Sequence, residues 1–156
     1  MAMSDRMKRV AVNEQEPGKR AKNFMEVCLG YDNERAVKEA LRCLHCKNPQ
    51  CIEGCPVSIN IPEFISYIKD NDIEGAAKEI AKYSSLPAVC GRVCPQESQC
   101  EGKCVLGIKG EPLAIGKLEK YAADWARENY VDVSFKEESN NIKVAIVGSG
   151  PAGLTC

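Results

Sequence analysis

The sequence predicts a mainly α fold, and three observations lead to this prediction. Apolar residues recur at helical spacing in four stretches between residues 32 and 129. Eight of the ten cysteines fall in two compact runs, at 43–55 and 90–104, which these helices would bring together. A strand-like stretch and a glycine-rich turn come only at 142–153, and they predict the start of a second, Rossmann-type domain.

The first helix is expected to begin near Asp32 and Asn33, because both residue types are good N-caps. It would end at the first cysteine pair, and its apolar face would consist of Val37, Ala40, Leu41 and Leu44. A helical hairpin should follow. One helix begins at 61–63 with Phe64, Ile65 and Ile68 inward, and Asp70-Asn71-Asp72 breaks it. The other uses Ile73, Ala76, Ala77, Ile80 and Ala81.

A longer helix is expected over 112–129, with Ile115, Leu118, Ala122, Trp125 and Ala126 on one face. The domains would then be an N-terminal arm with little structure of its own (1–31), a helical body (32–134), and a linker with a truncated second domain (135–156). The arm is interpreted either as a solvated tail or as a segment that docks on a partner domain. Residues 142–147 would form a buried strand, and the polar stretch 136–141 would be the linker.

Composition narrows the class of protein. Only 6% of the residues are aromatic and the formal net charge is −1, so nothing favours binding to nucleic acid or membranes. The chain shows neither a signal peptide nor an apolar stretch long enough to cross a bilayer, which predicts a cytoplasmic location. Disulfides are rare there, so closely spaced thiols indicate bound metal instead.

The two cysteine runs have the pattern of iron–sulphur ligands. Cys55 and Cys94 both precede proline, and in two-cluster ferredoxin motifs such a cysteine ligates the other cluster. We therefore expect a crossed arrangement, in which Cys43, Cys46 and Cys51 bind one cluster together with a ligand from the second run. Cys55 would reach a second cluster held by the remainder of that run.

Zinc is the alternative occupant, although only Cys43 and Cys46 have the Cys-x-x-Cys spacing that zinc sites favour. The single histidine, His45, is expected to be an exposed side chain, with a supporting role beside the ligands as the alternative. Cys28 and Cys156 are expected to be plain thiols. Glu119 borders the apolar face of the last helix without a basic neighbour three or four residues away, so an inward carboxylate there would need another partner, such as a metal.

The runs CLHCKNPQCIEGCP and VCGRVCPQESQCEGKC, followed by IGKLEKYAAD, resemble the N-terminal cluster domain of the glutamate synthase small (beta) subunit family. Dihydropyrimidine dehydrogenase and the large subunit of NADH-dependent ferredoxin:NADP oxidoreductase share this domain. The resemblance implies a small alpha-helical ferredoxin-like domain with two [4Fe-4S] clusters. It implies one cluster on Cys43, Cys46, Cys51 and Cys104, a second on Cys55, Cys94, Cys100 and Glu119, and no ligand role for Cys90.

The stretch VGSGPAGL resembles the FAD-binding opening of pyridine-nucleotide flavoproteins. Here Gly148 would make the tight turn, Gly150 would let the backbone approach a pyrophosphate, and Gly153 would permit close helix–strand packing. The acidic residue expected about 20 positions later is not in the chain. We interpret the chain as part of a larger flavoprotein that binds FAD and NAD(P)H only at full length.

Two functions remain open from the sequence. The first is an electron-transfer module, without catalysis of its own, that passes single electrons between FAD and a redox centre on a large catalytic subunit. In the glutamate synthase family that partner reduces the intermediate leading from 2-oxoglutarate to glutamate. The second is a zinc-bound interaction domain without a redox role.

Overall fold

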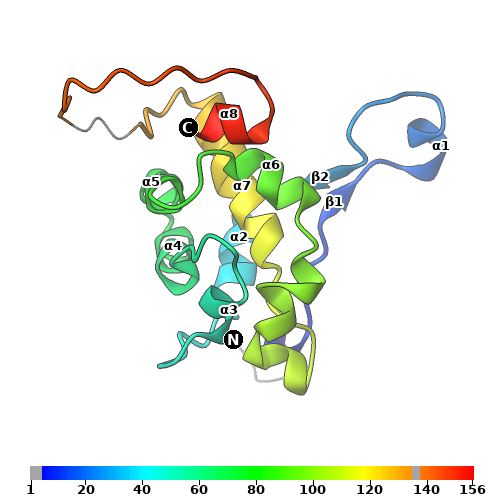
Figure 1. Cartoon of the computed structure of the whole chain (residues 1–156). Coiled ribbons are helices and arrows are strands. Elements are labelled where there is room, and N and C mark those ends of the chain that lie inside the picture. Colours follow the sequence, from blue (N-terminus) through cyan, green and yellow to red (C-terminus); the bar gives the residue numbers. More distant parts are fainter. Residues whose placement is uncertain (1–4, 135–137) are drawn as a thin grey trace.

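A computed structural model describes residues 5–134 and 138–156. The longest helix, α7 (Ile115–Glu128), packs against the other four helices of the body and lies at its centre (Figure 1). These are α2 (Asn33–Ala40), α4 (Ile61–Lys69), α5 (Ile73–Ala81) and α6 (Pro87–Val93). The connections contain the short α3 (Gln50–Glu53), η2 (Gln96–Ser98), η3 (Glu101–Lys103) and η4 (Val105–Ile108). The predicted mainly α fold is confirmed, whereas a following FAD domain is not shown.

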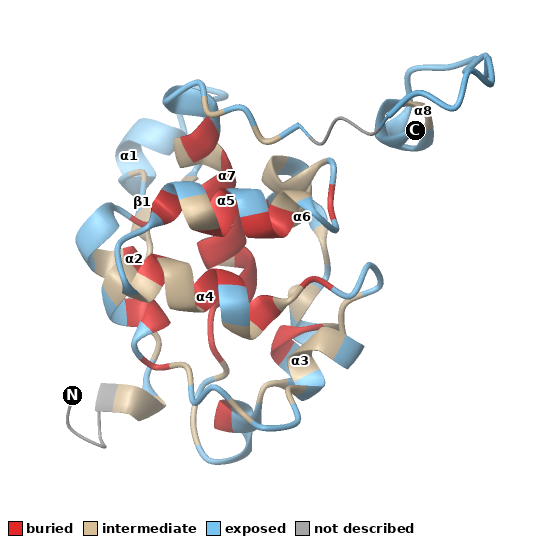
Figure 2. Ribbon diagram, turned by 90° about the vertical axis from the view of Figure 1, so that its left-hand side faces the viewer, coloured by how far each residue is buried: buried red, intermediate tan, exposed pale blue. Residues whose placement is uncertain are grey.

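The core is aliphatic and lies between α4, α5 and α7, whose buried faces point toward one another (Figure 2). All three expected positions on α4 are fully buried, and so are most of those expected on α5 and α7. The hairpin forms as predicted because Asp72 caps α5 by accepting a hydrogen bond from the Gly75 N–H at 2.8 Å. The helical periodicity therefore located these three helices correctly.

The apolar face predicted for α2 was partly wrong. Asp32 caps the helix as expected, accepting from the Arg35 N–H at 2.9 Å. However, α2 ends at Ala40, so Leu41 and Leu44 lie beyond it and both are 43% exposed. The buried positions are instead Ala36, Glu39 and Ala40. A buried glutamate on this face shows that α2 contributes a polar group to the interior as well as packing.

The N-terminal region has more structure than expected. Strands β1 (Asn13–Glu14) and β2 (Cys28–Gly30) pair antiparallel, and α1 (Pro17–Arg20) lies in the hairpin that projects from the body (Figure 1). Before it, η1 (Asp5–Met7) and the residues up to Val12 lie along the body, where Val10 and Val12 pack against the core. Residues 1–4 of the predicted arm lie outside the described residues. Sequence reasoning missed this docking because backbone hydrogen bonds hold the segment against the body, and such bonds leave no pattern in the sequence.

The buried strand predicted at 142–147 is not present. These residues have no regular secondary structure and are exposed, with Val144 at 80%. A strand needs a neighbour for its backbone groups, and no described segment pairs with this one. Part of the predicted linker, residues 136 and 137, lies outside the described residues. The helix expected after the glycine turn is present as α8 (Pro151–Thr155). Within the described segments, none of the helices has the length and apolar character needed to cross a membrane.

Candidate iron–sulphur sites

The first predicted ligand set gathers around one pocket. Cys43 and Cys46 lie in the loop after α2, Cys51 lies in α3, and Cys104 lies between η3 and η4, yet all four line the same pocket. Its remaining wall is largely apolar and includes Leu44, Ile61, Ile65, Leu106, Leu113 and Ile115. The fold therefore brings a cysteine of the second run against three cysteines of the first.

The thiols of this first set are electrostatically coupled. Burial, together with the negative charges that Cys104 and Cys43 would carry, raises the pKa of Cys51 to about 11. Burial also raises the pKa of Cys43, a hydrogen bond from the His45 backbone opposes the rise, and Cys104 and Cys46 add to it. Thiolates this close repel one another unless a cation lies between them, so the donor set suits a metal group.

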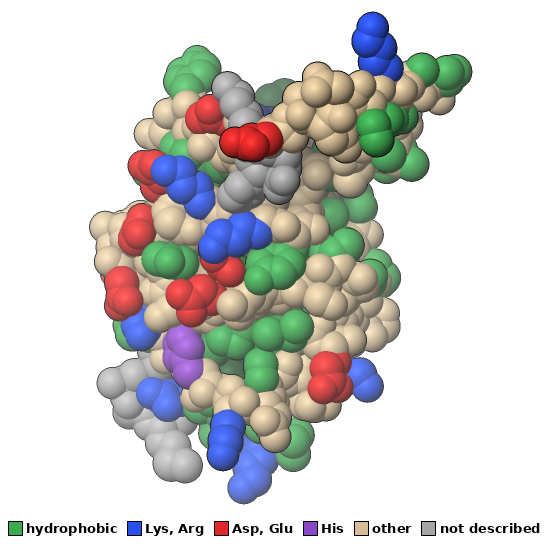
Figure 3. All heavy atoms as spheres, turned by 60° about the vertical axis from the view of Figure 1, so that its left-hand side comes forward, with side chains coloured by type: hydrophobic (Ala, Val, Ile, Leu, Met, Phe, Trp, Pro, Cys, Tyr) green, Lys and Arg blue, Asp and Glu red, His purple; other side chains and the backbone are tan. Residues whose placement is uncertain are grey.

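His45 lies between two of these cysteines. Its side chain is exposed, as expected, and it is the purple residue on the face shown in Figure 3. Its backbone is unusual, because φ is +45°, in the left-handed region that non-glycine residues rarely adopt. The residue therefore turns the chain between Cys43 and Cys46, a role that sequence reasoning did not identify.

The second predicted ligand set also comes from separate elements. Cys94 follows the last turn of α6, Cys100 is buried just before η3, and Cys55 closes the loop after α3. Burial raises the pKa of Cys100 to about 12, and the neighbouring charges of Glu101, Glu119 and Cys55 contribute. Burial similarly raises the pKa of Cys94 to about 11, with Cys90, Glu119 and Cys55 adding to it. Cys94 and Cys100 thus each lie close enough to Glu119 and Cys55 for the charges to act on one another.

Glu119 is the most informative member of the second set. It lies on α7, is only 7% exposed, and its Oε1 is fully buried without a hydrogen-bond partner. Burial raises its pKa to about 7. A buried carboxylate oxygen without a partner is unfavourable and rare in folded proteins. The nearby groups are thiols, which are weak donors at best, so the chemistry of this arrangement is compatible with a metal as the partner of Glu119.

Close packing of α6 on α7 brings Cys94 to Glu119. A Cβ atom added at Gly91 would lie 2.7 Å from the backbone nitrogen of Lys120 and 2.9 Å from the carbonyl oxygen of Gly116. Only glycine permits this separation between the two helices. Gly91 is therefore part of the architecture of the second site, although no ligand chemistry marks it in the sequence.

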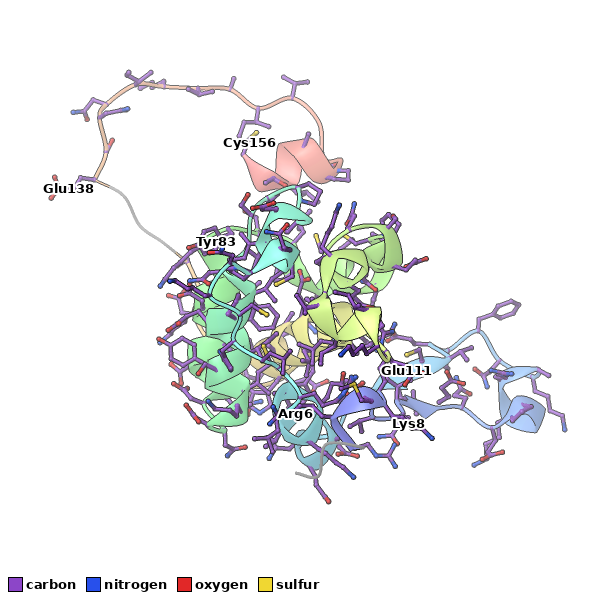
Figure 4. All side chains as sticks on the ribbon, turned by 90° about the horizontal axis from the view of Figure 1, so that it is seen from below. Arg6, Lys8, Tyr83, Glu111, Glu138 and Cys156 are labelled. Atoms are coloured by element: carbon purple, nitrogen blue, oxygen red, sulfur yellow. The ribbon has the colours of Figure 1, made fainter. Side chains whose placement is uncertain are left out.

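The remaining cysteines lie apart from the two sets or at their margin. Cys90 is near the second set, and its sulphur is 3.8 Å from Ser84 Oγ. Cys28 lies in β2, and Cys156 follows α8 at the exposed end of the chain (Figure 4). Over residues 5–134 and 138–156, no three His, Cys, Asp or Glu side chains are close enough to hold one ion.

Comparison with known proteins decides the family. Residues 20–131 match the family model described as dihydropyrimidine dehydrogenase domain II, 4Fe-4S cluster. The chain belongs to this family. It is 41% identical over 94% of its length to the glutamate synthase [NADPH] small chain of Halomonas elongata. It is 40% identical over 88% to the putative oxidoreductase UacF of Escherichia coli K12, and 37% over 83% to the NAD-dependent dihydropyrimidine dehydrogenase subunit PreT of the same strain.

Membership of the dihydropyrimidine dehydrogenase domain II family confirms the predicted resemblance and its iron–sulphur, oxidoreductase character. The aligned part covers 32% of the H. elongata protein, 22% of UacF and 31% of PreT, so the chain spans about a third or less of these relatives. The family model ends before the glycine turn, whose geometry is a separate observation. Gly148 has φ +120°, and a Cβ at Gly153 would lie 2.2 Å from the Gly148 carbonyl oxygen.

Proposed function

We propose that this chain is the electron-transfer module of an NAD(P)H-dependent iron–sulphur flavoprotein similar to the glutamate synthase small chain. Two [4Fe-4S] clusters would be bound, the first by Cys43, Cys46, Cys51 and Cys104, the second by Cys55, Cys94, Cys100 and Glu119. Such clusters supply one-electron transfer, here between FAD and a redox centre on a large catalytic partner subunit. The chain would carry no catalytic residue of its own.

The observation that carries the proposal is the unpartnered carboxylate of Glu119. An ordinary structural glutamate at a buried position accepts hydrogen bonds, as Glu39 does from the N–H groups of Val10 and Ala114. Glu119 Oε1 accepts none and shares its surroundings with the thiols of Cys94 and Cys100. A carboxylate that completes a set of three thiolates explains both its burial and its lack of a partner.

The protein's own residues would bind the clusters and control their surroundings. At the first site, the apolar wall that includes Ile61, Ile65 and Leu113 would keep water from the sulphur ligands. At the second site, α6 and α7 would fix the distance between Cys94 and Glu119. Each site takes ligands from both cysteine runs, so binding would also tie the two halves of the body together.

The C-terminal segment supports the flavoprotein part of the proposal. Gly148 has a positive φ that side chains disfavour, and a side chain at Gly153 would overlap the Gly148 carbonyl, as in dinucleotide-binding loops. With the remaining FAD domain, Gly148, Gly150 and Gly153 would face the pyrophosphate. NAD(P)H would reduce that FAD by hydride transfer, and the two electrons would leave it singly. We place such an enzyme in the cytoplasm.

Metal analysis of anaerobically prepared protein tests the proposal. We expect about eight iron and eight sulphide per chain, visible absorbance, and bleaching by dithionite. Glu119→Ala should lower the iron toward about four per chain by weakening one site. The matched variant Cys90→Ser should keep the full content, because Cys90 is adjacent to the site but not a ligand.

Three results would contradict this proposal. Folded, anaerobic protein that is colourless and poor in iron would exclude the clusters. Stoichiometric zinc without redox activity would favour the interaction domain instead. Loss of iron in Cys90→Ser, with full content in Glu119→Ala, would reverse the assignment of the last ligand.

A further inference from the structure

One cysteine of the first site receives a hydrogen bond from the backbone. The N–H of Leu113 donates to Cys104 Sγ, with the nitrogen and sulphur 3.4 Å apart. Leu113 is only 2% exposed, so water does not compete for this donor. Leu113 follows a proline and lies in the irregular segment between η4 and α7. Something outside this segment must therefore hold the N–H in place.

A buried ion pair on and just after α2 holds the chain on both sides of Leu113. Glu39 Oε1 accepts from the Ala114 N–H at 2.9 Å, and Arg42 Nη2 donates to the Glu111 carbonyl at 2.6 Å. Glu39 and Arg42 also pair with each other, and neither side chain is exposed. The two charges thus fix the peptide group after Leu113 and the one before Pro112, and Arg9 Nε donates to the Pro112 carbonyl between them at 2.7 Å.

The N-terminal segment completes this arrangement. Glu39 Oε2 accepts from the Val10 N–H at 2.8 Å, and Arg42 Nε donates to the Arg6 carbonyl at 3.1 Å. The Glu111 N–H donates to the Met7 carbonyl at 2.9 Å. Arg6 and Glu111 accordingly lie on neighbouring segments of the same region (Figure 4). Within the described part of the chain, the charged groups of the pair bond, apart from their mutual contact, only to backbone atoms of these two segments.

Stability alone is a weak explanation for such a pair. A fully buried salt bridge gains little over well-packed apolar side chains, because desolvation offsets most of the attraction. Polar groups that hold a metal ligand's hydrogen-bond partner have a different effect, since they tune the metal centre. Apart from the bond between Glu39 and Arg42, every described bond of the pair goes to the backbone of residues 111–114 or of residues 6–10. The first of these segments contains the donor to Cys104, and the second is hydrogen-bonded to the first. The arrangement therefore suits a role in holding the Leu113 N–H in position beside Cys104.

We propose that Glu39 and Arg42 are positioning residues that hold the Leu113 N–H against Cys104 Sγ and thereby raise the reduction potential of the cluster bound there. The inference rests on the proposed function, because it requires that cluster. Reduction adds negative charge to the cluster and its sulphur ligands, and a hydrogen bond to a more negative acceptor is stronger. Holding the donor in place therefore stabilises the reduced form.

Replacing leucine 113 by its α-hydroxy acid tests the donor directly. This amide-to-ester change removes the N–H and keeps the side chain. In a spectroscopic redox titration of the cluster-loaded chain, the potential of one cluster should become more negative, while the second cluster keeps its potential and serves as an internal control. An unchanged potential of both clusters would overturn the inference.

Shortening Glu39 tests the positioning role. Glu39→Asp keeps the negative charge beside Arg42 but withdraws the carboxylate from Ala114 and Val10, so the same cluster should shift in the same direction as in the ester variant. Glu79→Asp is the matched control, because Glu79 is also buried and pairs with a cation three residues later, Lys82. It should leave both potentials unchanged.

The signs of the shifts separate positioning from other effects. A shift of equal size in both aspartate variants, or a more positive potential in Glu39→Asp, would overturn the positioning role. If Glu39→Asp fails to fold, the ester variant still decides whether the donor matters. Failure of the proposed function looks different, since protein without iron would give no redox signal in any variant, including the wild type.

Discussion

The two predicted cluster sites are supported in different ways. At the first, three cysteines come from the loop after α2 and from α3, and the fourth, Cys104, lies beside a segment held by the buried charges of Glu39 and Arg42. At the second, three thiols and a carboxylate come from separate elements, and close contact between α6 and α7 at Gly91 brings two of them together. A polar network thus supports one site, and helix packing supports the other.

This difference indicates how each site should fail. Loss of a buried charge affects a site through unsatisfied polar groups, whereas loss of close packing affects it through displacement of whole helices. The first site should therefore respond to changes in charge far from its ligands. The second should respond to changes in volume at the α6–α7 contact.

The largest effect is expected from breaking the charge pair with Arg42→Met. The variant leaves Glu39 as an uncompensated buried charge, which should lower the free energy of unfolding by about 3–5 kcal/mol. It should also reduce iron at the first site more than at the second. Denaturant unfolding and metal analysis measure the two effects.

Lys82→Met provides the matched control. It breaks the pair with Glu79, but the lysine side chain is 51% exposed, so the loss should be much smaller than in Arg42→Met. Equal losses of unfolding free energy in the two methionine variants would show that burial of the Arg42 pair has no special role.

A smaller effect, confined to the second site, is expected from Gly91→Ala. The new methyl group would meet the α7 backbone at 2.7 Å, and relieving this overlap should lower the free energy of unfolding by about 1–3 kcal/mol. Displacement of α6 should cause loss of iron from the second site. Gly107→Ala is the control, because its methyl group would meet Pro112 at an ordinary 3.5 Å. Full iron content in Gly91→Ala would contradict the packing argument.

The sequence predicted the parts of the fold that local patterns encode. Apolar spacing located α4, α5 and α7, and the expected cap residue Asp32 located the start of α2. The predicted face of α2 failed because periodicity does not reveal where a helix stops, and Leu41 lies just past its end. The prediction of a strand at 142–147 was wrong for another reason. Its apolar pattern matches a strand, but pairing partners decide whether a strand forms.

The ligand residues were more predictable than their supports. Cysteine spacing and a resemblance named both sets, and Glu119 was already unusual as an unpaired carboxylate on an apolar face. The assignment of each ligand to a cluster remains a prediction. The same reasoning does not single out Glu39, because Arg42 three residues later is the basic neighbour that Glu119 lacks. Gly91 and the Leu113 N–H could not be found from the sequence either, because backbone approach leaves no side-chain signal.

The N-terminal hairpin offers the mildest comparison, because partly exposed charges attach it to α6 and α7. Glu26 accepts from Arg92 Nε at 2.9 Å and pairs with Lys120 Nζ at 2.9 Å, while Arg92 also pairs with Asp124 at 2.7 Å. The Arg92 hydrogen bond is the main cause that lowers the pKa of Glu26 to about 2. The Glu26 side chain is 45% exposed, so solvent screening should limit the attachment to under about 1 kcal/mol.

Glu26→Gln should therefore loosen the hairpin without affecting either site. At neutral pH, we expect amide exchange at 13–30 to accelerate by no more than about fivefold, with full iron content. The carboxylate's pKa is lower in the folded protein than its ordinary 4.5, so its stabilisation is complete above that pH. This stabilisation should disappear as the pH falls toward 2, so the amide exchange rates of the wild type and of Glu26→Gln should converge. The exchange rates of the two proteins should also converge in high salt, because salt screens the same exposed charges. A difference that persists both at low pH and in high salt would show that packing holds the hairpin.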